Sequence, residues 1–563
     1  MALDTDVRIA RQAKMRPILE IAADLGLPPS VVELYGPNKA KIRLDALSEL
    51  GPPRANVIIV TAMTPTPLGE GKTVCAIGLA LGLHRIGKKA VCALRQPSLG
   101  PFFGVKGGAT GAGRSQVLPL DEINLRLTGD IDAVAAAHNL LAALIDNHLF
   151  HGNKTGLHPD SITWSRCVDM SDRALRKVRI SVGQKTERTT RFDIAVASEA
   201  MAILALATSY QDLRGRLGRI IVGPTSAGNP VTADDLKAAG AMAALLRDAF
   251  KPNLVQTIEN TPAFIHTGPF GNIAHGNSSV VADLIASRCA DFVVTESGFG
   301  ADLGFEKYID IKCRTSGLQP SAAMIVATIR ACKVQGGSYE LRTGRPLPKE
   351  LLQENVEAVE IGSENLAHMI RIVRRTGLPA IVAINRFPSD TEREIEAVRG
   401  AASKAGAAGV EVIEAYARGG EGAVDIARAI ARACETRVVP RPFYEVSWPI
   451  REKIETIARD VYGAAGVDYT PHAQEDIDRY TAWGLGGLPI CMAKSQLSIS
   501  HDPKLRGVPK GFRVPIQQVR ASAGAGFLYP LLGDIMTMPG LPSVPASEHM
   551  DIDDLGNLIG FSE

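Results

Sequence analysis

Short apolar runs alternate with longer amphipathic segments along most of this chain, which is the pattern of a parallel α/β fold. Strands buried on both faces read as continuous runs of Val, Ile, Ala and Leu. Such runs predict strands at residues 57–60, 91–94, 219–222, 291–295 and 380–385, and at 324–329, where the apolar run continues into a helical pattern. The alternation continues to about residue 435, so we expect a largely parallel sheet.

Three helices are indicated by their apolar stripes and end signals. Residues 6–26 form an amphipathic segment that ends at a glycine followed by two prolines. Residues 132–149 form a second helix, rich in Ala and Leu. Residues 363–376 form a third, with Ser363 as N-cap and Gly377 just past the end. Its predicted buried stripe is Leu366, Met369, Ile370 and Val373.

The stretch TAMTPTPLGEGKT, residues 61–73, lies between the first predicted strand and an apolar helix. A strand, a Gly-rich turn and a helix are the parts of a phosphate-binding loop, in which backbone N–H groups and the helix N-terminus face a polyphosphate. Lys72 is expected to reach the β- and γ-phosphates, and the Thr73 hydroxyl to hold Mg²⁺. The alternative is a Gly-containing turn with a solvated lysine, since Thr66 occupies the first position of the usual G-x-x-x-x-G-K-[ST] pattern.

We therefore predict an α/β fold with a P-loop NTPase-type, mostly parallel sheet core and additional α/β domains. ATP is expected to contact the whole loop. Its residues are Thr66, Pro67, Leu68, Gly69, Glu70, Gly71, Lys72 and Thr73.

Composition narrows the class of protein without changing this picture. Of 563 residues, 45% are hydrophobic and 22% charged, as in a globular enzyme, and 62 Lys and Arg against 60 Asp and Glu give no basic excess for nucleic acid. The eight cysteines form no C-x-x-C pair, which favours reduced core thiols in a cytoplasmic protein over disulfides or zinc. No signal peptide or membrane-spanning run is visible, so no membrane partner is expected.

Candidate anion-binding residues follow the predicted strands. Arg95 ends the second strand and precedes the Gly-rich stretch QPSLGPFFGVKGGATGAG, so it is placed to bind a carboxylate or an acyl phosphate, unless it is only a surface arginine. Two later blocks are dense in polar residues and glycine. They hold His266, Asn272, His275, Glu296, Asp302, Glu306 and Lys312. Their spacing fits no tetrahedral metal site, so a loop that lines a nucleotide or another anion is the favoured interpretation.

Two aromatic residues stand just past predicted strands. Phe387 follows AIVAIN, and Tyr416 stands in EAYARGGEG. Two rings at neighbouring strand ends are able to sandwich a flat ligand, and the alternative is that both pack at the rim of the core.

Along essentially its whole length the chain resembles the formate–tetrahydrofolate ligase family, also called formyltetrahydrofolate synthetases. The matching stretches are TPTPLGEGKT, RQPSLGPFFGVKGGA, LPLDEINLRLTGDI, ENTPAFIHTGPFGNIAHG, VVTESGFGADLGFEKYIDIKCR, IVATIRACKVQGG, INRFPSDTE and TMPGLPSVPA.

The resemblance implies an ATP-dependent ligase. ATP would phosphorylate formate to formyl phosphate, and N10 of tetrahydrofolate would attack it to give 10-formyltetrahydrofolate, ADP and phosphate. Lys72 and Arg95 are then the catalytic residues. The implied substrate-binding residues are Gln96, Asp130, Phe387 and Tyr416, with the last two stacking on the pterin and Asp130 hydrogen-bonding it. Family members are similar in being homotetramers and in being activated by monovalent cations such as K⁺ or NH₄⁺.

On this basis the chain is divided into three domains. Residues 1–150 would form the P-loop nucleotide-binding domain, completed by 285–362. Residues 151–284 would form a second α/β segment that lines the nucleotide and formate site. Residues 363–563 would form a third α/β domain that carries the folate clamp.

The chain departs from the family pattern around the acceptor site. Tyr416 replaces the usual Trp, Gln96 replaces the Glu of many bacterial members, and the loop GGATGAG replaces GGAAGGG. Arg114, Arg126 and Asp132 stand where Tyr, His and His are usual. Two other functions therefore stay open: a diverged relative that passes the formyl group to another amine or pterin acceptor, and a non-catalytic P-loop ATP switch.

Overall fold

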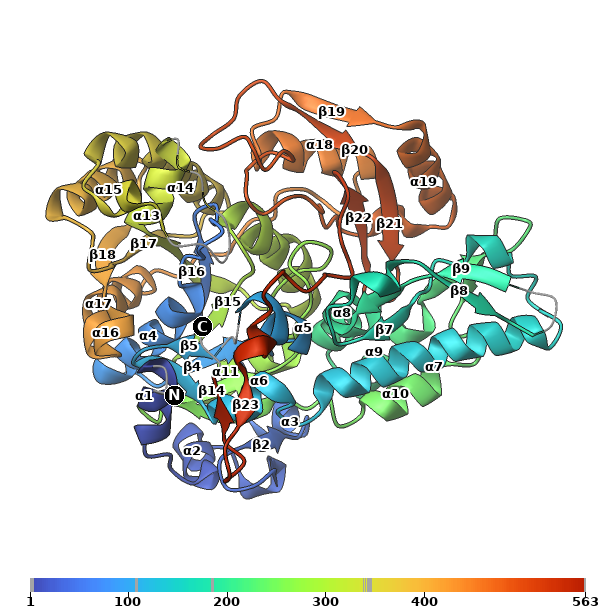
Figure 1. Cartoon of the computed structure of the whole chain (residues 1–563), viewed down its shortest axis with the longest axis horizontal. Helices are drawn as coiled ribbons and strands as arrows, with labels where there is room; N and C mark the ends of the chain where they lie inside the picture. The colour runs from blue at the N-terminus through green and yellow to red at the C-terminus, as the bar shows by residue number, and fades with distance from the viewer. Residues whose placement is uncertain are drawn as a thin grey trace.

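A large sheet runs through the middle of the protein (Figure 1). The computed structural model describes residues 5–106, 110–183, 187–337, 339, 341 and 347–560, and within them this sheet has 12 strands. Its parallel part runs in the order β14, β4, β15, β3, β16, β17 and β18. These strands are, in that order, Pro262–Ile265, Ala90–Leu94, Phe292–Glu296, Asn56–Ala62, Pro320–Ala327, Ala380–Asn385 and Gly409–Ile413. The predicted α/β fold with a mostly parallel sheet is confirmed.

Antiparallel strands extend the sheet beyond β14. β13 (Asn253–Thr257) pairs with β14, with β2 (Ala40–Ile42) and with β6 (Ser115–Leu118). β1 (Val32–Leu34) pairs with β2, and β5 (Gly111–Ala112) pairs with β6. Several of these strands are only two or three residues long, so they leave no periodic signal that sequence analysis can detect.

The central strand β3 is covered on both faces. Ile58 and Val60 pack into one apolar cluster, whereas Val57 and Ile59 pack into another, because successive side chains of a strand point to opposite faces. The helices α4 (Lys72–Arg85) and α17 (Val424–Ala433) contribute to the first cluster, and α11 (Val280–Cys289) and α14 (Val356–Arg375) to the second. Burial on both faces accounts for the unbroken apolar run of this strand.

Two further bodies flank the sheet (Figure 1). One is built on the helices α7 (Asp130–Phe150), α8 (Glu199–Leu206), α9 (Tyr210–Gly218) and α10 (Ala239–Leu246), which share their own apolar cluster. The other, near the carboxyl end, holds α18 (Ile450–Asp460), α19 (Pro471–Ala482) and two small sheets, β19–β20 (Gly466–Tyr469, Arg513–Ile516) and β21–β22 (Gln518–Ser522, Phe527–Leu531). Because β17 and β18 lie in the central sheet, residues after 363 also contribute to it, and the three-domain division stays a prediction.

Two of the predicted helices need correction. The segment 6–26 is divided into α1 (Thr5–Gln12) and α2 (Ile18–Leu25), because Pro17 cannot donate a helical hydrogen bond and stands as the N-cap of α2. The helix expected at 363–376 begins seven residues earlier, at Val356, with the side chain of Asn355 accepting from the Ala358 N–H. Ser363 is therefore inside the helix, where its hydroxyl donates to the Val359 carbonyl at 2.7 Å.

Two of the predicted strands also differ from the structure. The strand expected at 219–222 is β11 (Ile221–Pro224), which pairs antiparallel with β12 (Pro230–Thr232) and lies outside the central sheet. The run 324–329 belongs to β16 only as far as Ala327, because Thr328 caps the next helix, α13 (Ile329–Gly336). A capping hydroxyl thus ends a strand whose apolar pattern continues.

The eight cysteines are free thiols, and six of them are buried. No helix in the described ranges is both long and apolar enough to cross a membrane.

Candidate active site

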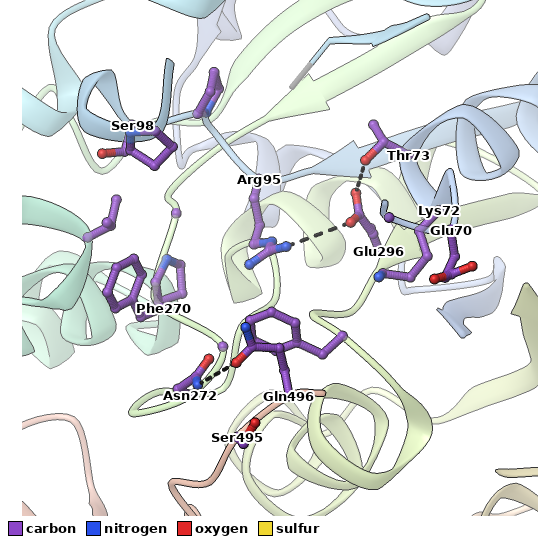
Figure 2. Close-up of a pocket in the computed structure, with 18 of the residues that line it drawn as sticks. Glu70, Lys72, Thr73, Arg95, Ser98, Phe270, Asn272, Glu296, Ser495 and Gln496 are labelled. Carbon is purple, nitrogen blue, oxygen red and sulfur yellow. Dashed lines mark hydrogen bonds and ion pairs between the residues drawn. The ribbon is translucent and has the colours of Figure 1, made fainter. Parts of the chain in front are cut away.

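A cavity of about 900 Å³ opens at the carboxyl ends of β3, β4 and β15 (Figure 2). Ligands of parallel α/β proteins bind at this edge of the sheet. The lining comes from the loop before α4, from Arg95 and the residues after it, from the segment 268–272, and from two carboxyl-terminal segments, 494–496 and 532–536. The cavity thus draws together segments that lie more than 400 residues apart.

The Gly-rich loop ends in a tight turn directly before α4. Gly71 has φ +68° and stands as the N-cap of α4, whose first residue is Lys72. A Cβ at Gly71 would lie 2.5 Å from Nδ2 of Asn385, which donates to the Glu70 carbonyl at 3.2 Å. Glycine is required here both by the left-handed conformation and by this close approach. The N-terminus of α4 therefore opens on the cavity, as an anion site at a helix end requires.

Glu70 stabilises the loop from inside. Its carboxylate accepts from the Thr66 N–H at 2.8 Å and from the Thr328 hydroxyl at 2.7 Å. Burial raises the pKa of Glu70, while its hydrogen bonds with Thr328 and Thr66 lower it in part. Thr66 stands where the usual motif has glycine, and the buried carboxylate of Glu70 holds its backbone in place.

Glu296 links the Gly-rich loop to Arg95. Its Oε2 accepts from the Thr73 hydroxyl at 2.9 Å, and its Oε1 lies 3.7 Å from Nη2 of Arg95. Figure 2 shows Glu296 between these two residues, with Lys72 extending its amine toward the same space. A hydroxyl, a carboxylate and two cationic side chains therefore meet at one side of the cavity.

The side chains of Arg95 and Gln96 line the cavity, and each has a buried polar atom without a partner among the described residues. Nε of Arg95 and Oε1 of Gln96 are buried without a hydrogen-bond partner in the described part of the chain. The Gln96 N–H donates to the Thr267 carbonyl at 2.6 Å, which fixes the backbone. Buried polar atoms are usually paired, so these two atoms are exceptions beside the cavity.

The loops after β14 and β15, opposite Arg95, each contain a residue with a strained backbone conformation. Thr267 and Phe299 have φ +55° and +61°, in the region that side chains other than glycine rarely adopt. A Cβ at Gly268 would lie 2.5 Å from the Gln96 carbonyl oxygen. Strain of this kind concentrates at functional sites, where the surrounding structure holds it.

Some residues of the two dense polar blocks line the cavity, whereas others are buried and stabilise the surrounding structure. Asn272 and Glu296 line the cavity, and Asn272 donates to Oε1 of Gln496 at 3.3 Å. His266 is buried between the Ser279 hydroxyl (2.6 Å) and the Ala249 carbonyl (2.7 Å), and burial lowers its pKa to about 4. Lys312 and Asp283 form a buried ion pair at 2.7 Å, as do Lys494 and Asp302. Within the described ranges no cluster of three or more His, Cys, Asp or Glu side chains is arranged to hold a metal ion.

The two aromatic residues do not line this cavity in the described chain. Phe387 and Tyr416 follow the paired parallel strands β17 and β18, so they stand at the same edge of the sheet. The guanidinium of Arg330 lies 3.9 Å from the centroid of the Phe387 ring. The side chain of Tyr416 is 48% exposed, and its hydroxyl donates to Oδ1 of Asp6 at 3.1 Å.

Asp130 is fully engaged in the interior. Its Oδ1 accepts from Nζ of Lys41 at 2.7 Å, and its Oδ2 accepts from Nδ2 of Asn253 at 2.7 Å. Both side chains of the ion pair are almost completely buried, and Asp130 is absent from the described lining of the cavity. Asp130 therefore anchors the start of α7. Its contact with the pterin stays a prediction.

Arg114, Arg126 and Asp132, which depart from the family pattern, contact each other or Tyr416. Arg126 and Asp132 form an exposed ion pair at 3.7 Å. The backbone N–H of Arg114 donates to the Tyr416 carbonyl at 2.8 Å, and Gly113 packs against the Tyr416 ring. Residues 107–109 of the Gly-rich loop GGATGAG lie outside the described residues.

Three residues of the site were not singled out as binding residues by sequence analysis. Sequence analysis places Glu296 only within a polar block. An acidic residue at the end of a buried strand is nevertheless a signal that it lines a ligand site. Asn385 and Gln496 left no signal, because their places above Gly71 and beside Asn272 arise from contacts across 314 and 224 residues.

Comparison with known proteins gives one consistent result. A family model described as formate–tetrahydrofolate ligase matches residues 4–562. A protein named formate–tetrahydrofolate ligase from Roseiflexus sp. (strain RS-1) is 57% identical over 99% of this chain and 100% of its own length. Proteins of the same name from Saccharopolyspora erythraea and Chloroflexus aggregans are 53% and 52% identical, again over 99% or more of both chains.

Proposed function

The chain belongs to the formate–tetrahydrofolate ligase family, and on that premise we propose that the cavity beside Lys72 and Arg95 is where ATP and formate react. The protein is an ATP-dependent ligase that joins formate to tetrahydrofolate. The observation that carries the assignment to this cavity is the linkage of Thr73, Glu296 and Arg95.

The phosphate loop is proposed to bind the polyphosphate of ATP in the manner of P-loop NTPases. The positive end of α4 and the loop N–H groups face the phosphates, and Lys72 neutralises charge on the γ-phosphoryl group as it is transferred. Support comes from the left-handed Gly71 at the N-cap and from the buried Glu70 that holds the loop closed.

Formyl phosphate is the proposed intermediate. An oxygen of formate attacks the γ-phosphorus, the bond from that phosphorus to the bridging oxygen of ADP breaks, and the formyl carbon becomes electrophilic. Arg95 is placed to hold the two anions together, since its planar guanidinium donates in pairs to carboxylate and phosphoryl oxygens.

Mg²⁺ fits the donor set at the end of β15. The Thr73 hydroxyl and the Glu296 carboxylate are hard oxygen donors, which together with phosphate oxygens and water suit this ion. When bound, it would offset the negative charge of the β- and γ-phosphates. Thr73 and Glu296 are the residues that would hold the ion.

Tetrahydrofolate is proposed to place its pterin against Phe387 and Tyr416. Both stand at the edge of the sheet that bears the phosphate loop, and Asn385 ties the end of β17 to that loop. The ring of Tyr416 is exposed and anchored at its hydroxyl, so a stacking face remains on a ring that cannot rotate freely. After stacking, N10 attacks the formyl carbon, the bond from that carbon to the phosphate oxygen breaks, and the proton of N10 passes to the released phosphate.

Further properties are carried over from the resemblance alone. We infer a homotetramer in the cytoplasm and activation by K⁺ or NH₄⁺, because these are features of the family and the free, mostly buried cysteines are compatible with a reducing compartment.

The test is turnover by the purified protein with ATP, formate and tetrahydrofolate. Acidification converts 10-formyltetrahydrofolate to the methenyl form, whose absorbance we expect to appear only when all three substrates are present. Release of ADP that depends on formate without any methenyl product would contradict tetrahydrofolate as acceptor. ATP binding without formate-dependent ADP release would contradict the ligase assignment itself.

A further inference from the structure

A second cavity of about 480 Å³ lies between the body built on α7 and α8 and the carboxyl-terminal elements α19, β21 and β22. Its lining shares no residue with that of the first cavity. Figure 1 shows β21 and β22 reaching down to α8, and Oε1 of Glu199, the first residue of α8, accepts from the Gly524 N–H at 2.8 Å. The volume is within the range of about 300–1,000 Å³ that is typical of small-molecule sites.

Three polar side chains converge in this cavity. Arg520 and Tyr529 are directly opposite each other in the β21–β22 hairpin. Burial raises the pKa of Tyr529 to about 12, the charge of Arg520 lowers it in part, and that of Glu199 raises it further. Glu199, from the other wall, lines the same cavity as the Arg520–Tyr529 pair.

Each of these three groups keeps hydrogen-bonding capacity. The Arg520 Nε donates to Oε1 of Gln518 at 2.9 Å, and no carboxylate pairs with its guanidinium in the described residues. Oε1 of Glu199 accepts from two backbone N–H groups, whereas its Oε2 and the Tyr529 hydroxyl have no hydrogen bond within that same part of the chain. The other two arginines of the lining differ, because Arg191 pairs with Asp193 and Arg479 with Asp476.

The remaining walls offer aromatic surface, and the indole N–H groups of its two tryptophans are already hydrogen-bonded. Nε1 of Trp164 donates to the His138 carbonyl at 3.1 Å, and Nε1 of Trp483 donates to the Gly228 carbonyl at 3.0 Å. Tyr480 and Trp483 are in edge contact, with ring centroids 5.6 Å apart. The guanidinium of Arg479 lies 5.3 Å and 5.7 Å from these two ring centroids and occupies part of their surface, and the rest of that surface is apolar.

We propose that the second cavity binds a small aromatic carboxylate that also carries a hydrogen-bond donor. The carboxylate pairs with the guanidinium of Arg520, whose planar fork matches it. The ring lies against Tyr480 and Trp483, and the donor reaches the free Oε2 of Glu199. This site does not rest on the reaction assigned to the first cavity.

The chosen probe is 4-aminobenzoate, which has one ring, one carboxylate and one amine. Isothermal titration calorimetry of the full chain is expected to show saturable binding that persists when a non-hydrolysable ATP analogue and formate fill the first cavity. The methyl ester of the probe keeps the ring and the amine but has no charge. We expect the ester to bind at least about tenfold more weakly, because a hydrogen bond to a charged group contributes about 1.5–3 kcal/mol.

Two variants locate the site. Arg520→Gln is expected to weaken the probe about tenfold or more, and Tyr529→Phe, which keeps the ring, is expected to weaken it by a smaller factor. Arg513→Gln is the matched control, because Arg513 is an exposed arginine of the neighbouring strand β20 that pairs with Asp468. It should leave binding unchanged.

Three results would overturn the proposal: displacement of the probe by the ATP analogue, equal affinity for the acid and its ester, or equal affinity in wild type and Arg520→Gln. Should Arg520→Gln fail to fold, as judged by its melting temperature, the comparison of acid and ester on the wild-type protein still decides.

Discussion

The hydroxyl of Thr73, in the first turn of α4, donates to Oε2 of Glu296, the last residue of β15, at 2.9 Å. This bond joins the phosphate loop to the neighbouring strand of the sheet. The same carboxylate lies 3.7 Å from Arg95, so one acidic side chain connects the two halves of the proposed reaction centre.

Glu296→Gln is expected to raise the Mg²⁺ concentration needed for half-maximal turnover. The amide keeps the size of the side chain but loses the negative charge that favours a divalent ion. Steady-state rates measured against Mg²⁺ at saturating ATP test this. Thr73→Ser keeps the hydroxyl and should behave like wild type, whereas Thr73→Val should resemble Glu296→Gln. An unchanged Mg²⁺ requirement in Glu296→Gln would place the ion elsewhere.

Lys72→Ala is expected to abolish turnover while the protein stays folded. Loss of charge stabilisation at the transferred phosphoryl group should reduce kcat on the order of 10³-fold or more. ADP release measures the rate, and thermal melting checks the fold. Lys88→Ala, which removes an exposed lysine just after the same helix, is the control and should retain full activity. Near-normal kcat in Lys72→Ala would disprove the phosphate-loop assignment.

Arg95→Ala and Arg95→Lys are expected to suppress formyl phosphate formation more than ATP binding. Lysine keeps the charge but lacks the planar fork, so it should restore only part of the rate. Formate-dependent ADP release reports the first step, and titration with an ATP analogue reports nucleotide affinity. A fall in nucleotide affinity as large as the fall in rate would assign Arg95 to ATP instead.

Tyr416→Ala is expected to raise the KM for tetrahydrofolate about tenfold or more, because a stacked aromatic contributes on the order of 1 kcal/mol beyond its buried area. The KM values for ATP and formate should barely change. Tyr416→Trp restores the residue usual in the family and should tighten tetrahydrofolate binding.

Tyr416→Phe separates the ring from its anchor. It keeps the stacking surface and removes only the bond to Asp6, so the KM should rise less than in Tyr416→Ala. A Trp variant that binds tetrahydrofolate worse than wild type would instead direct attention to Arg114, Arg126 and Asp132 as determinants of a different acceptor.

Glu199→Gln is expected to change how stability depends on pH. Burial raises the pKa of Glu199 from an ordinary value of 4.5 to about 7, against the effect of its bonds from Ala525 and Gly524. The folded state thus holds this proton more tightly than the unfolded chain does. Its stabilising contribution is complete below pH 4.5 and is lost as the pH rises through about 7.

The measurement is the melting temperature of both proteins at a series of pH values. Near pH 4 the two should melt alike, and by about pH 8 the Gln variant should be the more stable. All other titrating groups are common to both proteins, so the difference isolates Glu199. A difference that does not change with pH would mean that Glu199 titrates normally.

The local sequence was sufficient for the elements around the phosphate loop. The run from Val57 to Val60 could only be a strand buried on both faces, and glycine at 71 allows the left-handed turn that starts α4. These features depend on neighbouring residues and on the intrinsic conformational preferences of glycine and β-branched side chains. They are therefore readable without any knowledge of the fold.

Only the tertiary structure decided which residues meet. Glu296 comes next to Thr73 because β15 pairs with β3 across more than 220 residues, and Asn385 comes above Gly71 because β17 ends at the same edge. Asp130 stands two residues before the predicted helix 132–149, and only the structure shows that Lys41 and Asn253 bury and engage it. Partners this distant are set by sheet order and packing, which apolar periodicity does not encode, since every buried parallel strand shows the same pattern.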